Sequence, residues 1–239
     1  MLIEDFELHE TLNPKLWTSD NELRPEVRDK LIEIVDEFKS YVDVPLDVVD
    51  VHLVGSNASF NYTDESDLDV HVVTNFELMD ASREILLALY NLQKSSFNQN
   101  YDISIHGVPV ELYVEDIQAN TVSNGIYSLY REEWIKFPEK IPVQNYDIEE
   151  QLNKYKVFID QELIHGDYNG VLSVIDDLYL MRKNSMAVDG EYGAGNQLFK
   201  EIRSLGLLDA LKDRAKELNG KRLSLEGFTR GQIINMDWE

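Results

Sequence analysis

Residues 53–73 read LVGSNASFNYTDESDLDVHVV and contain two short motifs with ten residues between them. The first motif is Gly55-Ser56, and the second is the Asp-Leu-Asp triplet at 67–69. Glycine lets a backbone turn approach a phosphate closely, and an Asp-x-Asp triplet presents two carboxylates from one strand. The stretch therefore indicates a site for a divalent metal ion and a phosphorylated ligand.

Apolar segments rich in β-branched residues flank both motifs. Residues 48–54 (VVDVHLV) precede the glycine, and residues 68–74 (LDVHVVT) contain the second aspartate. This composition predicts a strand, a glycine turn that opens a short helix, and a second strand. Because strand side chains alternate between faces, we expect Asp67 and Asp69 to share one face while their apolar neighbours point into the core.

A third acid, Glu111, interrupts the apolar strand predicted at 108–114 (VPVELYV). If this strand lies beside the one that contains Asp67 and Asp69, three carboxylates converge. Such a cluster is costly without a counter-charge, and a divalent cation is the usual compensation. Three acids suffice for two Mg²⁺ ions, or Mn²⁺, once phosphate oxygens and water complete the coordination.

Apolar periodicity and turn residues define the rest of the chain. Helices are predicted at 25–42, 78–97, 147–164, 168–187, 196–205 and 207–218. Further strands are predicted at 103–105 and 108–114, around a tight His106-Gly107 turn, and in a hairpin at 126–137. Beyond Pro142 we expect helices, with a strand only near the C-terminus. The pattern predicts an α/β (α+β) module, residues 1–143, followed by a helical module, residues 144–239.

Composition limits the possible partners and ligands. The 45 Asp and Glu outnumber the 22 Lys and Arg, which gives a formal charge of −23. Such a surface repels phosphate backbones within a screening length of about 10 Å, so free nucleic acid is not expected as a partner. The absence of cysteine excludes disulfides, thiolate nucleophiles and sulfur-ligated zinc. Oxygen-ligated metal ions are therefore favoured.

The sequence predicts a folded cytoplasmic protein with no membrane partner. No run approaches the roughly 18 apolar residues of a membrane span. The first ten residues, MLIEDFELHE, are acidic where a signal peptide is basic and then apolar. The sequence gives no oligomeric state.

The stretch LVGSNASFNYTDESDLDVHVV resembles the nucleotidyltransferase superfamily typified by DNA polymerase β. Its motif is an apolar residue, Gly-Ser or Gly-Gly, nine to thirteen residues, and then Asp-x-Asp or Asp-x-Glu. The resemblance covers the N-terminal module. It implies a mixed sheet flanked by helices, Mg²⁺ dependence, and attack of an acceptor hydroxyl on the α-phosphate of a nucleoside triphosphate, with pyrophosphate leaving.

The resemblance also implies roles for individual residues. Gly55 and Ser56 would bind phosphate, Asp67 and Asp69 would ligate both metal ions, and Glu111 would be the third acid, near the attacking hydroxyl. Family members often carry Asp where this chain has Glu111. The segment after Gly-Ser, NASFNYT, has neither the glycine nor the basic residue found in cyclic-nucleotide synthases, which argues against that branch.

Further candidates lie outside the two motifs. Lys183 and Lys200, with Arg182 and Arg203 nearby, are candidate ligands of the triphosphate; the alternative is that they are solvated helix charges. The glycine-rich segment 189–196 is better interpreted as an interhelical connection than as a phosphate loop, because no strand precedes it.

Two side chains are expected on the same face as the acids. His71 shares the face of Asp69 and is a candidate to orient a carboxylate or touch the acceptor, against a purely structural role. Tyr113 shares the face of Glu111 and is a candidate to stack on a base or an acceptor ring.

Two functional hypotheses follow. In the first, a metal-dependent nucleotidyltransferase moves an NMP group from an NTP to a hydroxyl of an unidentified acceptor. An aminoglycoside-type antibiotic transferase is an alternative specificity, because a cationic acceptor suits an acidic cleft. In the second, the chain is a catalytically idle module that binds a nucleotide or a protein. The presence of all three acids and the Gly-Ser pair argues against loss of activity.

Overall fold

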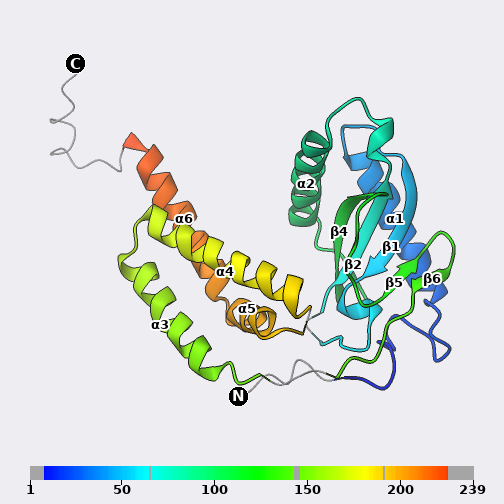
Figure 1. Cartoon of the computed structure of the whole chain (residues 1–239). Coiled ribbons are helices and arrows are strands. Elements are labelled where there is room, and N and C mark those ends of the chain that lie inside the picture. Colours follow the sequence, from blue (N-terminus) through cyan, green and yellow to red (C-terminus); the bar gives the residue numbers. More distant parts are fainter. Residues whose placement is uncertain (1–7, 65, 143–145, 191, 226–239) are drawn as a thin grey trace. The chain divides into compact units, whose positions relative to one another are not determined.

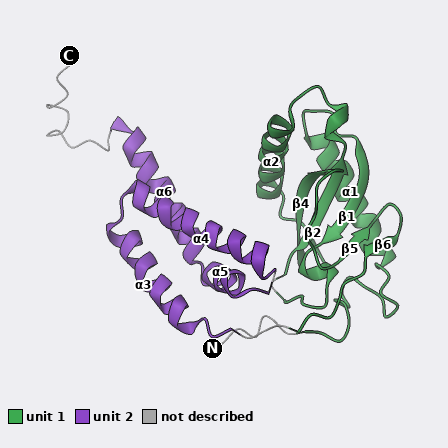
Figure 2. Ribbon diagram, in the orientation of Figure 1, with its two compact units in different colours: residues 1–143 green, residues 144–239 purple. Residues whose placement is uncertain are grey.

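The protein consists of two compact units, residues 1–143 and 144–239 (Figure 2). The division coincides with the boundary predicted from the sequence between a segment of alternating helices and strands and a segment of helices. A computed structural model describes residues 8–64, 66–142, 146–190 and 192–225. The strand expected near the C-terminus lies outside these described residues.

Unit 1 is built around a six-stranded sheet in the order β3-β4-β2-β1-β5-β6. Its elements are, in chain order, α1 (Pro25–Tyr41), β1 (Val48–Val54), η2 (Ser56–Ala58), β2 (Leu68–Thr74), η3 (Phe76–Leu78), α2 (Arg83–Asn100), β3 (Ser104–Ile105), β4 (Val108–Asp116), β5 (Ile126–Ser128) and β6 (Glu133–Lys136) (Figure 1). Strands β2 and β4 are parallel, and the other neighbouring pairs are antiparallel. The predicted α/β fold is confirmed, and its sheet is mixed.

Helices α1 and α2 cover one face of this sheet. Phe38 of α1 and Phe97 of α2 are fully buried, and their ring centroids lie 5.1 Å apart. Both belong to one apolar cluster with the core-facing side chains of the strands, which include Val51, Leu53, Leu68, Val70, Val72, Val110 and Leu112. Because side chains alternate along a strand, the residues between these core positions lie on the opposite face. That face carries the candidate site.

The segment before α2 differs from the prediction of a continuous helix from residue 78. Residues Phe76–Leu78 form a separate 3₁₀ turn, and α2 begins only at Arg83. The side chain of Ser82 accepts a hydrogen bond from the backbone N–H of Ile85 and so caps the helix. The hydrophobic periodicity extends across this cap, which explains the error.

The other helices and strands predicted for unit 1 agree with the structure. The hairpin expected at 126–137 is the antiparallel pair β5–β6. The turn between β3 and β4 has positive φ at both His106 (51°) and Gly107 (80°), as a tight hairpin turn requires.

The segment before α1, which the sequence left unassigned, packs into the core of unit 1. Trp17 is 1% exposed and stacks on Trp134 of β6 with a centroid distance of 4.6 Å. Its indole N–H donates a hydrogen bond to the backbone oxygen of Asn57 at 2.8 Å. The segment before α1 therefore supports the turn that follows β1.

Unit 2 consists of helices, as predicted. They are α3 (Glu149–His165), α4 (Tyr168–Val188), α5 (Ala194–Ser204) and α6 (Leu207–Leu223). Helix α4 packs against α5 and α6 through buried side chains such as Leu178, Phe199 and Leu211. Among the helices that the structure describes, none is long and apolar enough to cross a membrane.

Replacement of Phe97 by alanine should destabilise unit 1 by about 3–5 kcal/mol, because it leaves a cavity between α1 and α2. Denaturant unfolding followed by tryptophan fluorescence measures this, since Trp17 and Trp134 both lie in unit 1. The control is Leu92→Ala on the same helix, where the side chain is 71% exposed. It should change stability by less than about 0.5 kcal/mol. Equal unfolding midpoints for the two variants would contradict this account of the core.

Candidate metal centre

Three carboxylates converge on the open face of the sheet of unit 1. Asp67 directly precedes β2, Asp69 is the second residue of β2, and Glu111 lies in β4. Asp69 and Glu111 are register partners across the parallel strands. One carboxylate oxygen from each of the three acids lies within 4.8 Å of the others. The convergence predicted from the sequence is therefore present; we call these three residues the acidic triad.

Gly55, at the end of β1, lies directly against the acidic triad. Its φ is 74°, a conformation that residues with a side chain rarely adopt. A Cβ atom at this position would lie 2.0 Å from Oδ2 of Asp69. Glycine is thus required both by the backbone conformation and by the approach of the carboxylate.

The turn after Gly55 is connected to the second motif by side-chain hydrogen bonds. The side-chain amide of Asn57 donates to the backbone oxygens of Asp67 (2.8 Å) and Ser66 (3.2 Å). The hydroxyl of Ser56 donates to that of Ser66 at 2.8 Å. Asn57 is only 1% exposed. These bonds fix the position of Asp67 relative to the glycine turn although ten residues separate them.

The sequence motifs do not single out Asn57, because the segment NASFNYT contains neither a glycine nor a basic residue that would mark a ligand-binding turn. The sequence feature that could identify Asn57 is a polar residue in a turn between two strands that are expected to be buried. A buried amide there needs partners, and the neighbouring strand start is the nearest source of backbone groups.

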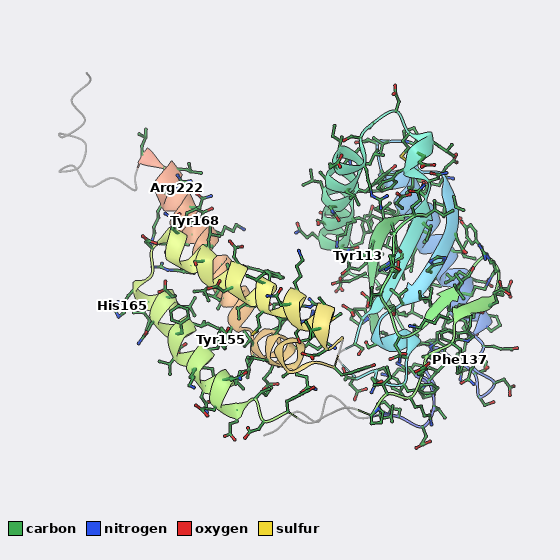
Figure 3. All side chains as sticks on the ribbon, in the orientation of Figure 1. Tyr113, Phe137, Tyr155, His165, Tyr168 and Arg222 are labelled. Atoms are coloured by element: carbon green, nitrogen blue, oxygen red, sulfur yellow. The ribbon has the colours of Figure 1, made fainter. Side chains whose placement is uncertain are left out.

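Tyr113 of β4, which is labelled in Figure 3, supports Glu111 directly. Its hydroxyl donates a 2.6 Å hydrogen bond to Oε2 of Glu111. Burial raises the pKa of the Tyr113 hydroxyl, and the hydrogen bond to Glu111 and the charges of the triad act in the same direction. The phenol therefore remains a donor at physiological pH. It shares the face of Glu111 as predicted.

Lys94 of α2 is a second residue that the sequence did not single out. Its ammonium nitrogen lies 3.8 Å from the centroid of the Tyr113 ring. Burial lowers the pKa of the Lys94 ammonium, and the negative charges of Glu111 and Asp69 act in the opposite direction. The positively charged side chain of Lys94 is thus close enough to Glu111 and Asp69 to interact with them electrostatically.

His71 lies on the same face, one register step from the acidic triad. Its Nδ1 is 2.7 Å from Oε2 of Glu115, a carboxylate outside the triad, and its ring lies 5.3 Å from that of Tyr113. The hydroxyl of Thr121 also donates to Glu115. Burial raises the pKa of Glu115, but the hydrogen bonds from His71 and Thr121 outweigh it, so the net pKa is lowered. His71 is thus hydrogen-bonded to a carboxylate outside the triad, and a role of His71 in the site or in contact with an acceptor remains a prediction.

The basic residues proposed from the sequence lie in unit 2. Lys183 is exposed on α4, Lys200 is partly buried on α5, and the guanidinium of Arg182 lies 5.0 Å from the ring centroid of Phe199. The glycine-rich segment joins α4 to α5, as the interhelical interpretation requires. A role of Lys183 and Lys200 in nucleotide binding remains a prediction.

The acidic triad fits a hard divalent cation. All its donor atoms are carboxylate oxygens, which are the ligands that Mg²⁺ and Mn²⁺ prefer. Three like charges within 4.8 Å repel one another, and a cation between them removes this repulsion. The partial exposure of all three side chains leaves room for water and ligand oxygens.

No model of a known protein family matches the sequence, and no curated protein or solved structure is significantly similar to the chain. The superfamily therefore remains a prediction from the resemblance of the two motifs.

Gly55→Ala should weaken Mn²⁺ binding about ten- to a hundredfold, because the new methyl group displaces the carboxylate of Asp69. Electron paramagnetic resonance of unbound Mn²⁺ measures the affinity. The matched control is Gly107→Ala, whose φ is also positive but whose Cβ would meet no atom within 4 Å. Both variants carry similar backbone strain, so only a loss specific to Gly55→Ala supports the proposed geometry. Equal Mn²⁺ affinity in the two variants would exclude it.

Proposed function

We propose that this protein is a metal-dependent nucleotidyltransferase that moves an NMP group from an NTP to a hydroxyl of an acceptor, with release of pyrophosphate. The observation that carries the proposal is the acidic triad held against the glycine turn on the open face of a mixed sheet. In support of the proposal, carboxylate oxygens, which hard divalent cations prefer, lie next to a glycine turn, and such a turn allows a phosphate to approach the backbone.

Each residue of the site has a defined part in this reaction. Asp67, Asp69 and Glu111 would hold two Mg²⁺ ions, or Mn²⁺. Bound there, the ions would lower the pKa of the acceptor hydroxyl and neutralise charge on the triphosphate and its leaving group. Ser56, whose hydroxyl can rotate away from Ser66, would donate to a phosphate oxygen. Tyr113 stays protonated and keeps the carboxylate of Glu111 in one orientation.

The chemical step is a displacement at the α-phosphorus. The acceptor oxygen forms a bond to this atom, and the bond to the bridging oxygen breaks with its electron pair going to pyrophosphate. The hydroxyl proton passes to solvent. The protein contributes positioning and charge stabilisation, and forms no covalent intermediate in this scheme.

The charge of −23 favours acceptors that are not free polyanions. A small cationic molecule such as an aminoglycoside suits this charge, whereas free DNA and RNA are disfavoured. A catalytically idle module that retains nucleotide binding is the rival function.

Incubation with each labelled triphosphate, Mg²⁺ or Mn²⁺ and pooled acceptors should give label transfer and pyrophosphate release. Asp67→Asn, Asp69→Asn and Glu111→Gln should each lower the rate about a thousandfold, because each removes a metal ligand.

The control for these variants is Asp64→Asn, which makes the same charge change on a fully exposed side chain three residues before Asp67. Its activity should equal that of the wild type. Metal-dependent nucleotide binding without transfer to any acceptor would favour the idle module. Activity that survives loss of the triad carboxylates would refute the assigned site.

A further inference from the structure

Lys94 occupies a position where the helical pattern calls for an apolar residue. The buried stripe of α2 runs through Leu86, Tyr90 and Phe97. Lys94 lies four residues after Tyr90 and three before Phe97, so it falls on the same stripe. Lysine is rarely found on a buried helix face unless its charge has a partner. The position of this lysine therefore requires an explanation.

Lys94 can reach the open face of the sheet because most of the outer edge of β4 is not covered by any neighbouring strand that the structure describes. Strand β3 covers only the beginning of β4, through pairs with Val108 and Pro109. Further along, the side chain of Asn98 contacts both the N–H and the C=O of Leu112 at 3.4 Å. Lys94 lies one turn before Asn98, and its side chain extends past the same edge to the Tyr113 ring.

The ammonium group lies over the Tyr113 ring, next to the acidic triad. It is held on the ring face of Tyr113, whose hydroxyl is bonded to Glu111. Glu111 and Asp69 both interact with it electrostatically. Lys94 thus places a positive charge beside the site from within unit 1, whereas Lys183 and Lys200 belong to unit 2.

We propose that Lys94 is a substrate-binding residue whose ammonium contacts the phosphate chain of the bound triphosphate, and that without ligand its charge offsets part of that of the triad. The inference depends on the proposed function. A flexible ammonium with three donors can turn from the carboxylates to phosphate oxygens while it remains near the Tyr113 ring. A purely structural lysine would instead only cover the aromatic ring.

The test compares the wild type with Lys94→Met, which keeps the length of the side chain and removes its charge. Isothermal titration with inorganic triphosphate at saturating Mg²⁺ should show about tenfold or greater weakening, because charge-assisted hydrogen bonds are lost. Mn²⁺ alone should bind about two- to fivefold more tightly to the variant, because a competing positive charge is removed. A structural role predicts neither change.

The control is Lys30→Met on the exposed side of α1, which makes the same change in net charge away from the site. It should leave both affinities unchanged. Lys94→Arg should retain most of the triphosphate affinity, because the positive charge is kept.

Two negative results are distinguishable. If the wild type binds inorganic triphosphate and Lys94→Met binds it equally well, Lys94 has no such role while the proposed function stands. If the wild type binds neither inorganic triphosphate nor any NTP with Mg²⁺, the proposed function fails and the role of Lys94 fails with it. Loss of both Mn²⁺ and triphosphate binding in Lys94→Met would show that the substitution disrupts the site itself, and would overturn the inference.

Discussion

The close approach of Asp69 to Gly55 is the constraint on which the site depends. The carboxylate occupies the space that a Cβ atom of residue 55 would fill, and the backbone there has a positive φ. The antiparallel pairing of β1 with β2 brings the two residues to the same end of the sheet, since Val54 is the register partner of Asp69. The parallel pairing of β2 with β4 then places Glu111 beside Asp69. Two backbone pairings and one missing side chain thus assemble the acidic triad.

Neutral and positive groups surround this concentration of negative charge. The amide of Asn57 holds the backbone before β2, the phenol of Tyr113 donates to Glu111, and the ammonium of Lys94 lies on the phenol ring. The arrangement keeps three carboxylates close together in a protein that is already strongly acidic. A divalent cation between the carboxylates would remove their mutual repulsion, and the proposed phosphoryl transfer depends on such an ion.

Much of this could be predicted from the sequence, because the informative signals are local. Strands β1 and β2 were delimited by β-branched runs, and the face of Asp67 and Asp69 follows from the alternation of strand side chains. The start of α2 was placed too early, because apolar periodicity does not show where a cap interrupts it. Asn57 and Lys94 were missed, because their partners are distant in sequence or lie on other elements.

Residue types and periodicity are enough to predict most helices and strands, the spacing of the two motifs and the oxygen donors of the site. They do not show that β4 lies parallel beside β2, that a carboxylate approaches Gly55, or that the Lys94 ammonium lies over the Tyr113 ring; these features come from the tertiary structure. The reason is physical. Strand order and the path of a long side chain depend on the packing of α1 and α2 against the sheet, which no local pattern encodes.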